Sequence, residues 1–78
     1  MTKEEIIEEL KRMKNDFDLK SVQFSQQSNS SLGTLSSSIS QEDREEILKT
    51  SYRALGSKAA YDGAGATLQL LLAEAQKP

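Results

Sequence analysis

The chain has 78 residues, of which 36% are hydrophobic and 28% are charged, and its formal net charge at pH 7 is −2. This length suits one domain, because two domains would need roughly 100 residues or more. Cysteine and histidine are both absent, which excludes a disulfide framework, cysteine-based metal sites and Ser-His-Asp or Cys-His catalysis. The composition therefore favours binding over catalysis. We expect a protein that is not an enzyme and that uses no cofactor and no metal.

Neither a secretory signal nor a membrane span is visible. A secretory signal needs a stretch of about 7–15 apolar residues, whereas Met1 is followed by Thr2, Lys3, Glu4 and Glu5. The longest strictly apolar run, residues 70–73, is far shorter than the roughly 20 residues that cross a bilayer. We therefore expect a cytoplasmic protein that does not bind a membrane.

The first predicted element is an amphipathic helix over about residues 2–27. Thr2 is a good N-cap, and Glu5 three residues later completes a capping-box pattern. Neither glycine nor proline occurs before Gly33, so the helix can continue past residue 20. The alternation of Val22 and Phe24 leaves a short strand as the alternative. One face of the helix carries apolar residues at spacings of four, three and four: Ile6, Leu10, Met13 and Phe17.

A serine-rich segment follows, with eight serines between residues 25 and 40. Serine competes for nearby backbone hydrogen bonds and has little surface to bury, so such a segment favours a loop. We expect this connecting loop over about residues 28–40. The functional alternative to a plain connector is a mobile binding loop or a phosphorylation site.

A second helix is predicted over about residues 41–76, with Ser40 as its N-cap. Acidic residues crowd its first turns, where the helix dipole favours negative charge. The pair Gly63 and Gly65 makes a break into two helices the alternative, since Asp62–Gly63 is a common turn dipeptide. Apolar or small residues recur at helical spacing along this segment: Leu48, Tyr52, Leu55, Ala59, Gly63, Ala66, Leu70 and Ala73.

Small residues four apart on the second helix predict a close approach of the two helices. Met13, Phe17 and Phe24 of the first helix are the bulky counterparts that could fill the resulting grooves. The small residues form two stripes, one of Gly56, Ala60 and Ala64, the other of Ala59, Gly63 and Thr67. The expected fold is thus all-α, an antiparallel two-helix hairpin forming a single domain over residues 1–78.

Such a hairpin is small for an independent fold, because a core of this size rarely supplies more than about 3–5 kcal/mol. Leu68 and Leu72 also point away from Leu70 at 100° per residue, so one partner helix cannot cover all three. We therefore expect a homo-oligomer, for instance two hairpins in a four-helix bundle. The predicted interface comprises Leu55, Ala59, Gly63, Ala66, Leu68, Leu70, Leu71 and Leu72.

Basic and aromatic residues lie close together in the middle of the second helix. Tyrosine can stack on a base while lysine or arginine holds a phosphate, which suggests a small anionic ligand such as a nucleotide at the subunit interface. DNA recognition is disfavoured because the second helix begins with acidic residues. The candidate ligand-binding residues are Lys49, Tyr52, Arg53, Lys58 and Tyr61.

These patterns together favour a small, non-enzymatic, oligomeric binding protein. We expect a regulator or inhibitor that acts through protein–protein contact, of the kind that phages and bacterial mobile elements encode. Its partners would be itself and another protein. The alternatives are a binder of a small anionic ligand and a structural subunit of a larger assembly.

Overall fold

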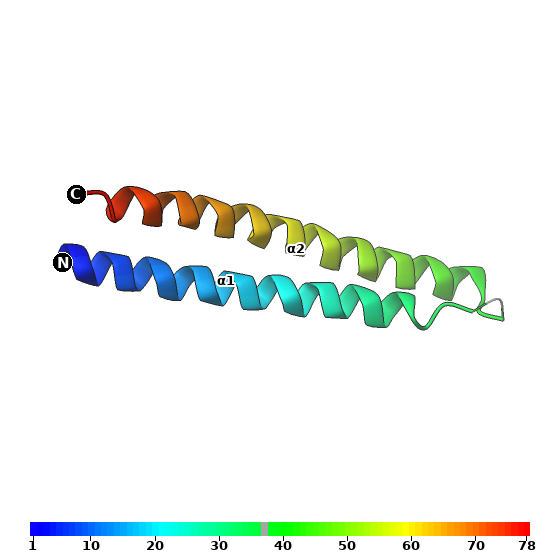
Figure 1. Cartoon of the computed structure of the whole chain (residues 1–78). Helices are drawn as coiled ribbons and strands as arrows, with labels where there is room; N and C mark the ends of the chain where they lie inside the picture. The colour runs from blue at the N-terminus through cyan, green and yellow to red at the C-terminus, as the bar shows by residue number, and fades with distance from the viewer. Residues whose placement is uncertain (37) are drawn as a thin grey trace.

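The chain forms two long helices that lie side by side and run in opposite directions (Figure 1). The computed structural model describes residues 1–36 and 38–78. Helix α1 spans Lys3–Leu32 and helix α2 spans Gln41–Ala75. Both chain ends lie at the same end of a rod that measures 60 × 15 × 13 Å. The expected all-α hairpin of two packed helices is confirmed.

Both predicted N-caps are present. The Thr2 hydroxyl oxygen accepts a hydrogen bond from the Glu5 backbone N–H at 3.2 Å. The Ser40 hydroxyl oxygen accepts one from the Asp43 backbone N–H, also at 3.2 Å. Each bond satisfies one of the backbone donors that a helix start leaves without a partner.

The first helix is longer than predicted, because it ends at Leu32 rather than near residue 27. Several residues assigned to the serine-rich loop are therefore helical. Ser28 shows why, since its buried side chain packs against α2 and tertiary contact outweighs the weak helix preference of serine. The described connector is correspondingly shorter than the predicted 28–40, and Ser37 of that range lies outside the described residues.

The second helix is continuous through both glycines, which excludes the break at Asp62–Gly63. Its N-terminal boundary, Gln41, is the predicted one, and its last residue, Ala75, lies one position before the predicted end. Alanines on both sides of the glycines support the helix, since alanine has the highest helix propensity.

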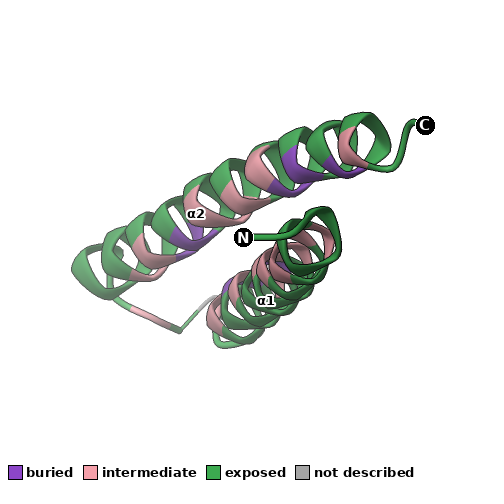
Figure 2. Ribbon diagram, turned by 90° about the vertical axis from the view of Figure 1, so that its left-hand side faces the viewer, coloured by how far each residue is buried: buried purple, intermediate pink, exposed green. Residues whose placement is uncertain are grey.

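The two helices meet along a seam of small and polar residues with leucines at one end. Figure 2 shows the buried stretches of α2 turned toward α1, while the opposite side of α2 is exposed. In the described part of the chain, α1 contributes buried Ser21 and Ser28 to this inner seam. The buried residues of α2 are Ser51, Ala54, Gly65, Leu68 and Leu72.

Two buried serines hold the seam together near the connector. The Ser51 hydroxyl donates to the Ser28 backbone carbonyl at 3.1 Å, and the Ser28 hydroxyl donates to the Ser51 oxygen at 3.4 Å. Since these hydroxyls find partners in each other, they can be buried without the penalty of an unsatisfied polar group. Their burial was not predicted, although Ser21 and Ser28 each lie four residues after an aromatic residue of the same helix, Phe17 and Phe24.

An aromatic cluster occupies the middle of the seam. The ring of Tyr61 lies edge-on to Phe17, with centroids 5.3 Å apart, and stacks on Phe24 at 5.8 Å. The Lys20 ammonium nitrogen lies 5.4 Å from the centroid of the same ring. Phe17 and Phe24 of α1 therefore pack against the ring of Tyr61, whereas small residues of α2 were predicted to face them.

The sequence predicted that α1 would pack against the small residues of α2, and this prediction is wrong for Gly56 and Gly63. A Cβ atom added at either position would meet nothing within 4 Å. Gly65 is the glycine that faces α1, where an added Cβ would lie 3.2 Å from the Asp18 Oδ1 atom. Gly56 and Gly63 lie about 160–180° around α2 from the centre of the inner seam.

The open position of Gly56 leads to a stability prediction. Gly56→Ala should raise the free energy of unfolding by about 0.5–1 kcal/mol, because alanine restricts the unfolded chain and favours the helix. Urea unfolding followed by circular dichroism measures this difference. Gly65→Ala is the matched control and should gain less, since Asp18 must move aside. A loss of stability in Gly56→Ala would contradict the assignment of this position to open solvent.

Candidate functional site

A continuous row of exposed apolar and small residues runs along the side of α2 that faces away from the inner seam. Tyr52 is 80% exposed and Leu70 is 72% exposed. The row recurs at spacings of three and four residues, so it stays on one face of the helix over about 38 Å. We call these eight exposed residues the outer row: Leu48, Tyr52, Leu55, Ala59, Gly63, Ala66, Leu70 and Ala73.

The structure divides the predicted oligomer interface between two faces. Leu68 and Leu72 are buried between α1 and α2 of the same chain, so they are hairpin core residues rather than surface available to another copy. Leu71 is exposed but lies on neither face, about 100° around α2 from Leu70 and from Leu72. The other five predicted residues belong to the outer row: Leu55, Ala59, Gly63, Ala66 and Leu70.

The five predicted ligand-binding residues do not converge on one site. Tyr61 lies in the aromatic cluster of the seam, and Lys58 pairs with Asp62, with 2.6 Å between Nζ and Oδ2. Lys49, Tyr52 and Arg53 do lie together. With Glu45 and Leu48 they line an open hollow of about 590 Å³.

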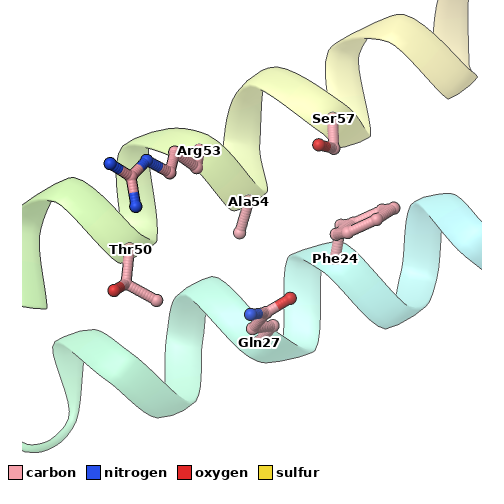
Figure 3. A pocket seen from close by; sticks show the side chains of 6 residues that line it. All are labelled: Phe24, Gln27, Thr50, Arg53, Ala54 and Ser57. Carbon is pink, nitrogen blue, oxygen red and sulfur yellow. The ribbon is translucent and has the colours of Figure 1, made fainter.

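A second, smaller hollow of about 210 Å³ lies between the helices near the connector. Figure 3 shows Phe24 and Gln27 entering it from α1, opposite Ala54 and Ser57 of α2. Arg53 also lines this hollow and is thus shared by both. The lining of the smaller hollow is thus mixed, with the polar side chains of Gln27, Thr50, Arg53 and Ser57 beside the apolar Phe24 and Ala54.

A polar contact ties the two helices together beside the aromatic cluster. The Ser21 hydroxyl of α1 donates to one carboxylate oxygen of Asp62, while the Lys58 ammonium donates to the other at 2.6 Å. These hydrogen bonds, that of Lys58 first, lower the pKa of Asp62 from its ordinary 3.8. The ionised carboxylate is therefore the form that the fold favours.

This contact predicts a loss of stability in acid. Because the pKa of Asp62 is lower in the folded than in the unfolded chain, its contribution is complete above about pH 4 and is lost as the pH falls through the folded pKa. Urea unfolding measured at a series of pH values should show this decline. Asp62→Asn should weaken the decline without abolishing it, because Arg12 lowers the pKa of Glu9 in the same direction. An unchanged pH dependence in Asp62→Asn would contradict the role of the contact.

Comparison of the chain with protein-family models, curated proteins and solved structures gives no match. Among the described residues, no helix is long and apolar enough to cross a membrane. Residues 1–36 and 38–78 also contain no group of three or more acidic side chains placed to hold a metal ion.

Proposed function

We propose that this chain is a non-enzymatic protein-interaction module, a regulator or inhibitor that acts in the cytoplasm by binding, and that the outer row of α2 is its contact surface. The observation that carries this proposal is the exposure of large apolar side chains at helical spacing on the side of α2 opposite α1. Contiguous exposed apolar surface of this kind marks interaction sites in small proteins.

The residues that are buried in the inner seam also support the proposal. Within the described chain, the buried apolar residues are Ala54, Leu68 and Leu72, while the largest exposed side chains of α2 lie outside the seam. Burial of leucine and tyrosine would stabilise the hairpin more than burial of serine, yet Ser51 is buried in the seam while Tyr52, Leu55 and Leu70 stay exposed. This distribution is expected when the outer face has a contact of its own to make.

Site-specific photocrosslinking tests this function in cells that express the protein. A photoreactive phenylalanine derivative in place of Tyr52 should crosslink to a protein partner, and Leu55→Glu in the same chain should abolish that product. The matched control places the same group at Gln23, an exposed polar residue of α1. Equal crosslinking from both positions, or none from Tyr52, would refute the proposal. Circular dichroism verifies that each variant keeps its helices.

The hollow beside Tyr52 supports a second candidate function, the binding of a small anionic ligand. Lys49 and Arg53 flank the Tyr52 ring there, an arrangement that suits a phosphate beside a stacked base. Glu45 lines the same hollow and opposes an anion, so this candidate ranks second. Calorimetric titration with a nucleotide tests it, and Arg53→Ala should abolish binding without changing the mass of the protein assembly.

A further inference from the structure

The charges around the outer row have an order that distinguishes its possible partners. Lys49 flanks the row near the start of α2, and Glu74 flanks it near the end; both side chains are exposed. Glu74 also pairs with Lys77 of the same chain, which lies beyond the end of α2, with 2.6 Å between Oε2 and Nζ. The eight members of the row itself are uncharged.

We infer that the occupant of the outer row is the outer row of a second copy of this chain, packed antiparallel about a two-fold axis near the middle of α2. This inference rests on the proposed function, since it names the partner of the same surface. A two-fold contact is self-complementary, so each pairing of residues occurs twice.

Antiparallel packing makes the charges complementary. With the axis beside residue 61, Lys49 lies opposite the partner's Glu74, and the two-fold axis repeats this pair at the other end of the contact. At 100° per residue, Lys49 and Glu74 lie on the same flank of the outer row. In an antiparallel helix pair, residues on the same flank of the two helices face each other. In a parallel two-fold pair, the same flank of the two copies lies on opposite sides of the interface, so Lys49 would not meet the partner's Glu74.

The same register places small residues together at the centre of the contact and large ones farther out. Ala59 lies opposite the partner's Gly63, and Leu55 lies opposite the partner's Ala66, so the helix backbones can approach closely at the centre. Farther out, Tyr52 lies opposite the partner's Leu70. In a parallel pair, each of these residues would instead meet its own copy, Tyr52 against Tyr52.

The size of the row sets the strength of the contact. A helix face about 38 Å long and 10–12 Å wide buries on the order of 400 Å² per chain. Interfaces of this size form weak, reversible complexes. The dimer should therefore exchange with single hairpins as the protein is diluted, and sedimentation equilibrium over a wide concentration range should record both species.

Engineered cysteines test the orientation directly, because the chain has none of its own. The variants Tyr52→Cys and Leu70→Cys, mixed and oxidised, should yield mainly the mixed disulfide, which mass spectrometry identifies. Each variant alone should yield little, since residues 52 and 70 are about 27 Å apart along the helix and a disulfide spans about 6 Å between Cα atoms. Efficient self-linking of Tyr52→Cys alone would establish parallel packing and overturn the inference.

A charge-swap pair tests the register without cysteines. Lys49→Glu and Glu74→Lys should each weaken dimerisation on the order of tenfold, because each replaces two attractive contacts by two repulsive ones. The double variant should restore the original dissociation constant. If it does not, the register is wrong.

Gly63→Leu separates loss of the dimer from loss of the fold. Nothing within the chain lies within 4 Å of a Cβ at this position, so the hairpin should keep its helix content while the crowded centre prevents dimerisation. Unchanged association in Gly63→Leu would overturn the inference. A chain that sediments as a single copy at every concentration would also overturn it. The proposed function would survive that result if Tyr52 still crosslinks to a different protein.

Discussion

Leu72→Ala should lower the free energy of unfolding of the single hairpin by about 2–3 kcal/mol. Leu72 is 5% exposed, and its truncation removes apolar contact and leaves a cavity between the helices. Since a fold of this size has only about 3–5 kcal/mol of stability in total, the variant should be largely unfolded at moderate temperature. Circular dichroism during thermal and urea unfolding, on protein dilute enough to be a single copy, measures the effect.

Leu70→Ala provides the matched control, two residues away on the same helix. Leu70 is on the outer row, so its truncation should change the unfolding free energy of the single hairpin by less than about 0.5 kcal/mol. At high protein concentration the same variant should reduce self-association. Equal destabilisation of the dilute hairpin by both substitutions would contradict the assignment of these leucines to opposite faces.

Tyr61→Ala should have a comparably large effect, lowering the free energy of unfolding by about 2–3 kcal/mol. The ring contacts both Phe17 and Phe24 of α1 and receives the Lys20 ammonium over its face. Its removal therefore separates the helices at the centre of the hairpin. Urea unfolding measures the loss. Tyr61→Phe keeps the ring and should remain close to the natural protein.

The other tyrosine supplies the control. Tyr52→Ala should leave the stability of the dilute hairpin within about 0.5 kcal/mol of the natural protein, because its side chain is on the outer row. Its effect should be on association with the partner. If Tyr52→Ala unfolded the dilute hairpin as readily as Tyr61→Ala, the outer row would be part of the fold and not a contact surface.

The sequence predicted the elements of the fold well because their signals are local. Thr2 and Ser40 mark the helix starts through hydrogen bonds to backbone groups three residues away. The continuity of α2 through Gly63 follows from the surrounding alanines, whose helix propensity outweighs the cost of glycine. The end of α1 was placed too early, because the burial of Ser28 depends on α2 and leaves no local signal.

The structure brings together only some of the five residues named as a candidate ligand site. Lys49, Tyr52 and Arg53 lie together, since residues three and four apart on a helix are neighbours. Tyr61 and Lys58 lie elsewhere, because both contact other residues at the seam side of α2. Their place depends on where α1 packs, which spacing within α2 does not indicate.

Local sequence alone thus dictates two helices, their starts and the reversal between them. Only the tertiary structure determines which face of α2 packs against α1. Two stripes of small residues on α2, which include Gly56 and Gly63, were predicted to face α1. The helices instead pack through Ser28, Ser51 and Gly65, because small residues and mutually bonded hydroxyls allow close approach around the Tyr61 cluster. That packing leaves the outer row of α2 exposed to solvent.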